Sequence, residues 1–170
     1  MKKTKLTKKE LLLKIFQLQK EITKKIENLN NGGCGNFTFL FYQEVIKFYP
    51  KDKVRIVLFD NWTSIREKKS IIKSIKTGDE MFDIFDKLAS SHCMIEIDKV
   101  LYLDGYYIYR KKVDYCRWDR CTYKGYVTLD ELHCTLEYGF WNDDYDTDQN
   151  SKLHKIIKKH FKVDKKKVKK

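Results

Sequence analysis

The sequence predicts an α+β fold in which N-terminal helices pack on an antiparallel sheet. Three features support this class: an apolar period of three to four positions near the N-terminus, a short run of β-branched residues, and a hairpin pattern further along the chain. With 170 residues, of which 42% are hydrophobic and 14% aromatic, the chain is large enough for one sizeable core. Glycine and proline are scarce and no repeat is visible. We therefore expect a single domain.

The net charge of +12 lies at the two ends of the chain. Residues 1–9 contain five lysines and no acid, and residues 155–170 contain nine lysines against Asp164 alone. The stretch between them is close to neutral. We predict a basic tail at 1–9, one domain at 10–161 and a lysine-rich tail at 162–170. Such tails attract nucleic acid without selecting a sequence.

Cysteine usage and hydropathy indicate the compartment. Five cysteines, an odd number without framework spacing, argue against a disulfide-rich secreted domain. No apolar run is long enough to span a membrane, and the N-terminus lacks the apolar core of a signal peptide. We predict a cytoplasmic protein, in the host cytoplasm if a virus encodes it, with no membrane partner.

Two helices are predicted before the sheet. The first covers residues 8–29, with apolar residues at a near-heptad spacing and lysines and glutamates on the other face. A helix of this length could pair with a partner helix, but packing on its own domain is the simpler expectation. The second covers residues 35–48, has one apolar face and ends before Pro50.

The predicted sheet begins with a strand in the β-branched run of residues 53–60. Two further helices, at 63–76 and 79–89, separate it from a hairpin at 91–105 that turns near Asp98-Lys99. The tyrosine-rich stretch after this hairpin should continue the sheet.

Two helices are expected near the C-terminus. Thr128 precedes two acidic residues and is a predicted helix cap. The final helix is predicted at 151–161, where it buries its leucine, isoleucine and phenylalanine residues.

The segment from Asn30 to Phe37 contains the candidate nucleophile. Two glycines precede Cys34, and the apolar period of a buried helix begins at once. Cys34 would then lie in the first turn of that helix, a setting that lowers the pKa of a thiol and favours the nucleophilic thiolate. The glycines allow a sharp bend and close approach of a substrate. The competing interpretation is a buried structural cysteine, since unpaired cysteines are among the most buried residues.

His92 and Asp104 are the candidate partners of this thiol. They begin and end the predicted hairpin, so they lie at the same end of it. A two-residue loop would place Asp104 on the face opposite His92, whereas one extra residue brings both to the same face. We predict the longer connection. Cys93 then points away from His92 into the core.

These residue types together fit nucleophilic catalysis. A thiol needs an imidazole to accept its proton and later to protonate the leaving group. The imidazole needs a carboxylate or amide that fixes its tautomer. A backbone N–H at the helix start, that of Cys34 included, can bind the oxyanion of a tetrahedral intermediate.

Gly-Gly-Cys-Gly at the start of an apolar helix, His-Cys-Met-Ile-Glu-Ile, and Tyr-Leu-Asp-Gly together resemble the papain-like cysteine hydrolase superfamily. The pattern is most similar to transglutaminase-like proteins and to small papain-fold proteins of viruses and bacteria. The resemblance covers residues 28–110 and implies a papain-like fold, with Cys34 as nucleophile, His92 as base and Asp104 as the orienting acid.

The same resemblance directs attention to the residues before the cysteine. Papain has a glutamine upstream of its cysteine in the oxyanion hole, and this chain has asparagines in that region. Asn30, Asn31 and Gly33 are therefore the candidates for oxyanion and substrate binding.

Two groups of residues imitate metal sites. Cys116 and Cys121 are spaced C-x4-C, wider than the pairs of structural zinc sites. Asp144, Asp146 and Asp148 have the spacing of an EF-hand loop, but glutamine follows where that loop needs glycine. We predict no metal and no cofactor.

Three function classes remain open. The first is a cysteine-dependent hydrolase or acyl transferase that acts on a peptide or isopeptide bond. The second is a catalytically inactive papain-fold protein that binds a protein partner as an inhibitor or accessory factor. The third is a nucleic-acid-binding protein that uses its basic tails. The lysine- and isoleucine-rich composition suits an AT-rich genome such as that of a phage or another virus.

Overall fold

The computed structural model describes residues 5–60, 92–110, 122–137 and 145–162. The helices are α1 (Lys8–Lys25), α2 (Cys34–Val45), α6 (Leu129–Glu137) and α7 (Asn150–His160), with 3-10 turns η1 (Lys51–Lys53) and η2 (Thr147–Gln149). The strands are β1 (Val54–Asp60), β2 (His92–Ile97), β3 (Leu101–Leu103), β4 (Ile108–Tyr109) and β5 (Thr122–Val127). The helices predicted at 63–76 and 79–89 lie outside the described residues.

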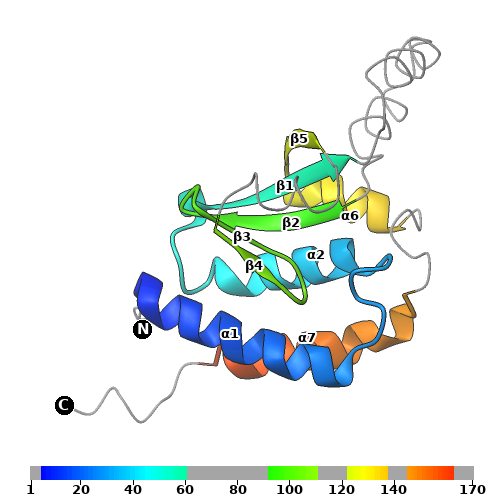
Figure 1. Ribbon diagram of the computed structural model, residues 1–170, viewed down its shortest axis with the longest axis horizontal. Coiled ribbons are helices and arrows are strands. Elements are labelled where there is room, and N and C mark those ends of the chain that lie inside the picture. The colour runs from blue at the N-terminus through cyan, green and yellow to red at the C-terminus, as the bar shows by residue number, and fades with distance from the viewer. Residues whose placement is uncertain (1–4, 61–91, 111–121, 138–144, 163–170) are drawn as a thin grey trace.

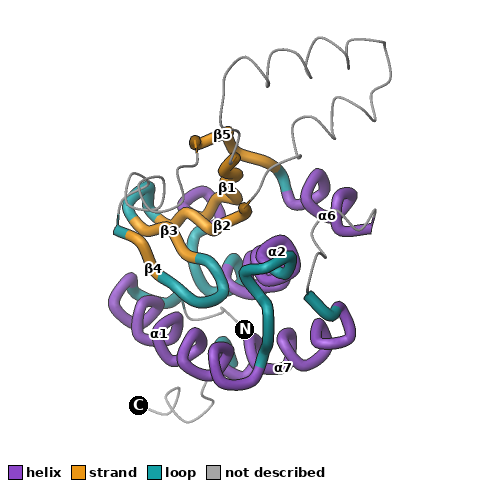
Figure 2. Tube along the Cα trace, turned by 45° about the vertical axis from the view of Figure 1, so that its right-hand side comes forward, coloured by secondary structure: helices purple, strands orange, loops and turns teal. Residues whose placement is uncertain are grey.

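The described strands form one antiparallel sheet in the order β4-β3-β2-β1-β5. Figures 1 and 2 show α2 against one face of this sheet, with α1 and α7 side by side on the far side of α2. The predicted α+β class, with N-terminal helices packed on an antiparallel sheet, is confirmed.

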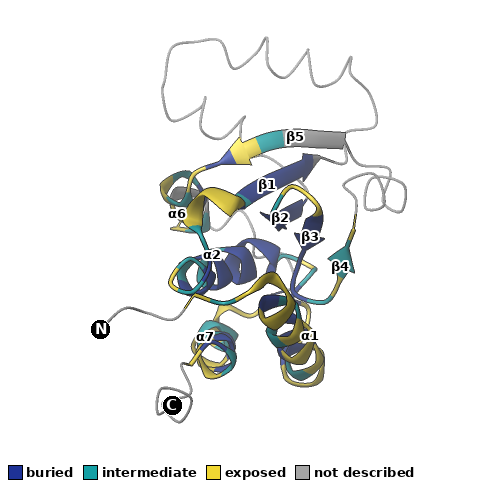
Figure 3. Cartoon of the chain, turned by 90° about the vertical axis from the view of Figure 1, so that its left-hand side faces the viewer, coloured by how far each residue is buried: buried dark blue, intermediate teal, exposed yellow. Residues whose placement is uncertain are grey.

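Helix α2 is the central layer of the molecule. Nine of its twelve residues are buried, as the dark ribbon in Figure 3 shows, and Phe37 and Phe41 are fully enclosed. Their rings stack at 5.3 Å, and Phe41 meets Phe161, just after α7, edge to face at 5.5 Å. The helix ends three residues before the predicted boundary because the chain tightens into short turns ahead of Pro50.

Helix α1 starts where the sequence predicts and ends earlier. Thr7 and Glu10 form a capping box, so ordered structure begins before the predicted domain boundary at residue 10. The helix ends at Lys25, not at Leu29, and Asn28 in the following loop has a φ of 53°. Leu29 is nevertheless fully buried. The apolar spacing of the helix extends into the loop because the Leu29 side chain packs in the same core as the buried residues of α1.

Glu21 joins α1 to α7. Its carboxylate lies 2.8 Å from Lys159 Nζ and from His160 Nε2, and 2.7 Å from Lys25 Nζ. Hydrogen bonds from Lys159, Lys25 and His160 lower the pKa of Glu21 to about 2. His160 has lysine-rich neighbours in the sequence, yet this contact between the two helices encloses most of its side chain.

Glu21→Gln should therefore lower the free energy of unfolding by about 0.5–1 kcal/mol at pH 7. Because the folded-state pKa is depressed, this contribution is present above pH 4.5 and is lost as the pH falls toward 2. Urea unfolding at pH 7, 4 and 2.5 tests this, with Glu27→Gln as a control of equal charge change. A difference from wild type that persists unchanged at pH 2.5 would contradict the assignment.

Candidate active site

Cys34 is the first residue of α2, and its side chain is buried at 2% exposure. Thr38, one helical turn later, donates from Oγ1 to the Cys93 carbonyl oxygen of β2 at 3.3 Å, so this side of α2 faces the sheet. The first N–H groups of a helix have no acceptor within it and form its positive dipole end. The predicted position of the cysteine, in the first turn of a buried helix, is confirmed.

The connection between β2 and β3 has the predicted extra residue. Ile97 pairs with Leu101, which leaves three residues in the loop. Asp98 and Lys99 form its turn with φ values of 53° and 60°, and the Val100 N–H donates to the Ile97 carbonyl oxygen at 3.2 Å. This turn sets the register of the hairpin.

That register brings His92 and Asp104 to the same end of the hairpin. Ile95 pairs with Leu103, where β3 ends, so Asp104 is the first residue after the paired strand, and His92 is the first residue of β2. His92 Nε2 lies 3.2 Å from Asp104 Oδ2, and both side chains are buried.

Cys34 completes this group from the helix side. Its sulfur is within hydrogen-bonding reach of the His92 ring. Because Nε2 faces Asp104, the ring nitrogen that remains for the thiol is Nδ1. The structure therefore brings together the three residues that the sequence predicts, from a helix start, a strand start and a strand end.

The electrostatics of the group favour a charged imidazole. Burial alone would lower the pKa of His92, but its interactions with Cys34 and with Asp104 outweigh that effect. The pKa of His92 is raised to about 10. The protonated imidazole is therefore favoured, and the ring lies between the Cys34 side chain and the Asp104 carboxyl group. A thiolate beside an imidazolium is the arrangement of a nucleophilic cysteine.

Cys93 differs from Cys34 in this respect. It is fully buried among core side chains on the α2 side of the sheet. Burial, and then the nearby Cys34, raise the pKa of the Cys93 thiol well above its ordinary value. Cys93 is thus a neutral core residue, as the strand alternation predicts.

Asp104 is fixed by its own turn and by α1. Its Oδ1 accepts the N–H groups of Tyr106 and Tyr107, each at 2.8 Å, which leaves Oδ2 for His92. Gln19 donates from Nε2 to the carbonyl oxygens of Asp104 at 3.0 Å and Tyr107 at 2.8 Å. The carboxylate is therefore held on both sides before any substrate arrives.

The loop before Cys34 is attached to the same turn. The Leu29 N–H donates to the Tyr106 hydroxyl at 3.0 Å, and this hydroxyl donates to the Ile26 carbonyl oxygen at 3.1 Å. A Cβ on Gly105 would lie 2.2 Å from Leu29 Cδ2, so the two segments touch directly. The nucleophile loop and the Asp104 turn are thus one packed unit.

The sequence did not single out Gln19 or Tyr106. One signal for Gln19 was present, because it lies on the apolar face of its helix between Ile15 and Ile22. A polar side chain in such a place needs a partner. Nothing in the spacing of Tyr106 distinguishes it from the neighbouring tyrosines.

The predicted oxyanion residues occupy three different environments. Gly33 is the N-cap of α2, directly beside Cys34. Asn31 is exposed in the preceding loop. Asn30 Oδ1 is buried near Gly105, without a hydrogen-bond partner in the described part of the chain. This oxygen is an acceptor, so Asn30 could stabilise an oxyanion only through its Nδ2 group, whereas the backbone N–H groups at the start of α2 are donors already placed beside Cys34.

A separate hollow of about 400 Å³ lies between α2, α6 and the start of α7. Its lining includes Asn36, Phe39 and His133, and the last two rings stack at 5.0 Å. It includes none of Cys34, His92 and Asp104. Asn36 is two residues after Cys34 and therefore points about 200° away around the helix. The hollow and the thiol lie on different sides of α2.

The aspartates and cysteines whose spacing resembles metal sites either have another role or lie outside the described residues. Asp146 Oδ1 accepts the Asp148 N–H at 2.9 Å and so caps the turn that leads into α7. Asp144, Cys116 and Cys121 lie outside the described residues. Within the described ranges, no three histidine, cysteine, aspartate or glutamate side chains form a metal-binding group. None of the described helices is long and apolar enough to cross a membrane.

Comparisons with protein-family models, curated proteins and solved structures gave no significant match. The resemblance to papain-like hydrolases therefore rests on the motifs and on the geometry around Cys34.

Proposed function

We propose that the protein is a cysteine-dependent hydrolase or acyl transferase that acts on an amide bond, peptide or isopeptide, through a papain-like Cys34–His92–Asp104 triad. The observation that carries this proposal is the convergence of the three side chains at the start of α2, with His92 between a thiol and a carboxylate. Each residue has a partner suited to its proposed role.

The proposed reaction follows from these positions. The Cys34 thiolate attacks the amide carbonyl carbon, and N–H groups at the start of α2 stabilise the negative charge on its oxygen. His92 gives its proton to the nitrogen as the C–N bond breaks, which releases an amine and leaves a thioester on Cys34. Water then completes hydrolysis, or a second amine completes transfer, with His92 accepting the proton of the incoming group. Asp104 stabilises the imidazolium in both steps.

A second candidate is a catalytically inactive protein with the same arrangement that binds a protein partner. The observation in its favour is burial, because the exposed fractions of Cys34, His92 and Asp104 are 2%, 5% and 1%. The two candidates differ in the reactivity of the thiol, which can be measured without a known substrate.

The test is the rate of Cys34 alkylation by iodoacetamide between pH 6 and 9, followed through the mass of the proteolytic peptide that contains Cys34, because the chain has four other cysteines. Because the raised pKa of His92 favours the imidazolium over this range, we expect fast modification of Cys34 that varies little with pH. In His92→Ala the rate at pH 7 should fall by about tenfold or more and rise with pH like that of an ordinary thiol, whose pKa is about 8.5.

His154→Ala is the matched control, since His154 also contacts a buried carboxylate, that of Glu44 at 3.3 Å. It should leave the profile unchanged. A Cys34 that is inert at every pH, or equally reactive with and without His92, would remove the enzyme proposal and favour the inactive binding protein.

A further inference from the structure

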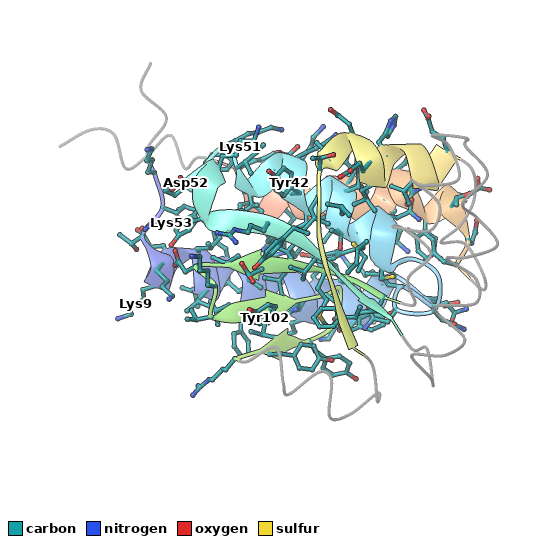
Figure 4. All side chains as sticks on the ribbon, turned by 90° about the horizontal axis from the view of Figure 1, so that it is seen from above. Lys9, Tyr42, Lys51, Asp52, Lys53 and Tyr102 are labelled. Atoms are coloured by element: carbon teal, nitrogen blue, oxygen red, sulfur yellow. The ribbon has the colours of Figure 1, made fainter. Side chains whose placement is uncertain are left out.

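Lysines from three separate segments gather at the end of the molecule opposite Cys34. They come from the start of α1, from η1 and from the β2–β3 turn, and all are exposed. We call them the lysine pole: Lys5, Lys8, Lys9, Lys51, Lys53 and Lys99. Figure 1 shows these segments at one end and the α1–α2 loop at the other, and Figure 4 shows Lys9, Lys51 and Lys53 on the same side.

The pole is built into the fold. Asp98 lies 3.5 Å from Lys8 Nζ and 3.8 Å from Lys53 Nζ, and its carboxylate accepts the Tyr49 hydroxyl at 2.7 Å. The Asp98 N–H donates to the Lys53 carbonyl oxygen at 2.9 Å. The Leu6 N–H donates to the Phe48 carbonyl oxygen at 2.8 Å, which fixes the chain ahead of α1. Three segments are thereby held together before any ligand binds.

Carboxylates at this end do not balance the lysines. Asp98 is shared by two lysines, and the Glu10 carboxylate accepts from the backbone and hydroxyl of Thr7. Asp52 is the third acid near the pole. Six lysines therefore face three carboxylates, two of which are already engaged.

Both ends of the described chain lie near the pole. The described chain begins at Lys5, within the pole, and ends at Lys162. Lys162 follows Phe161, whose ring lies 6.2 Å from that of Phe48, and the Phe48 carbonyl oxygen accepts the Leu6 N–H. Lys162 thus adds a further lysine close to this end.

We propose that the lysine pole binds the phosphate backbone of nucleic acid without selecting a base sequence. Lysine ammonium groups bind phosphates as point charges, and the pole has no arginine to form a bidentate contact with a base. Stable adsorption to a membrane usually needs an apolar anchor beside the charge. Of the large apolar side chains exposed in the described part of the chain, Val100 lies in the pole, and Leu13 and Phe16 lie one and two turns along α1 from Lys9, so vesicles are the competing ligand in the test.

The lysine pole lies at a distance from the candidate nucleophile Cys34. The 18 residues of α1 lie between them, a length of about 27 Å. A nucleic acid at the pole therefore leaves Cys34 uncovered. This inference is independent of the catalytic proposal, since it uses none of the same residues.

Fluorescence anisotropy of the full chain with two labelled 20-base-pair duplexes of unrelated sequence, over a salt series, tests the proposal. Both duplexes should bind equally, with affinity falling steeply as salt rises. The triple variant Lys51→Gln, Lys53→Gln, Lys99→Gln should make the slope of log K against log salt shallower by about 2 to 3, since each lost phosphate contact removes close to one unit.

The matched control carries the same charge change away from the pole, at exposed positions of α1 and α7: Lys20→Gln, Lys24→Gln and Lys155→Gln. It should keep the wild-type slope. Equal losses in the two triple variants would show that net charge alone drives binding and would overturn the proposal. Preference for phosphatidylserine vesicles over duplex, or no binding at 50 mM salt, would also overturn it. The alkylation rate of Cys34 should be the same in all three proteins.

Discussion

Asp104→Asn should lower Cys34 alkylation at pH 7 by about tenfold or more, and amide turnover by about 10²- to 10⁴-fold, while the fold stays nearly as stable. The carboxylate has two tasks on two oxygens. Oδ1 accepts the N–H groups of Tyr106 and Tyr107, and Oδ2 faces His92 Nε2. An asparagine keeps the first task with its own Oδ1 and turns an NH₂ group toward the imidazole.

The substitution places a hydrogen-bond donor opposite His92 Nε2, where the carboxylate had placed an acceptor. Nε2 would have to accept from the amide, so the proton of the neutral ring moves to Nδ1, the nitrogen that should accept from Cys34. The loss of the negative charge also removes one cause of the raised pKa of His92. The imidazolium is then less favoured at neutral pH, and the thiolate with it.

Asp104→Ala is the contrasting variant, because it removes both tasks. Two hydrogen bonds to a charged acceptor would be lost, and the free energy of unfolding should fall by about 2–4 kcal/mol. Urea unfolding and alkylation, measured on both variants, separate positioning from stability. Loss of stability in Asp104→Asn as large as in Asp104→Ala would show that the oxygen facing His92 serves the fold and not the thiol.

The parts of this site that sequence predicts are those encoded by local patterns. Cys34 is identified by the glycines before it and by the apolar period after it. His92 and Asp104 belong to one hairpin, whose register depends on a single additional loop residue, Val100. These features need only neighbouring residues and the periodicities of helices and strands.

The supporting contacts could not be predicted in the same way. Gln19 reaches Asp104 across 85 residues of chain, and Tyr106 reaches Leu29 across 77. Neither pairing leaves a spacing that a single sequence displays. The oxyanion role of the asparagines before Cys34 stays a prediction from residue type, since the buried atom of Asn30 is its oxygen and the donor group of the amide is Nδ2.

Gly33→Ala should destabilise the protein by about 3 kcal/mol or more and slow alkylation of Cys34. A Cβ at this position would lie 2.7 Å from the Leu29 carbonyl oxygen and 2.6 Å from Tyr145 Cδ2. The φ of Gly33 is −89°, so the conformation suits any residue and the obstacle is space. The start of α2 would have to move, and Cys34 with it.

Gly105→Ala provides the comparison that identifies the cause. Its Cβ would lie 2.2 Å and 2.9 Å from two Leu29 side-chain carbons, with no backbone atom among its nearest neighbours. Leu29→Ala removes that clash, so the double variant Gly105→Ala, Leu29→Ala should be about as stable as Leu29→Ala alone. That single variant costs about 2–5 kcal/mol as a core truncation.

The same rescue should fail at Gly33, because truncating Leu29 or Tyr145 leaves the Leu29 carbonyl oxygen in place. Urea unfolding of the four single and three double variants measures both couplings. We expect Gly105→Ala to couple strongly with Leu29→Ala, and Gly33→Ala to couple weakly with Leu29→Ala or Tyr145→Ala. This result would show that the Leu29 carbonyl oxygen fixes the start of α2 and so the position of the Cys34 thiol. Full rescue of Gly33→Ala by Tyr145→Ala would instead assign that constraint to the tyrosine ring, and the backbone contact would have no part in placing Cys34.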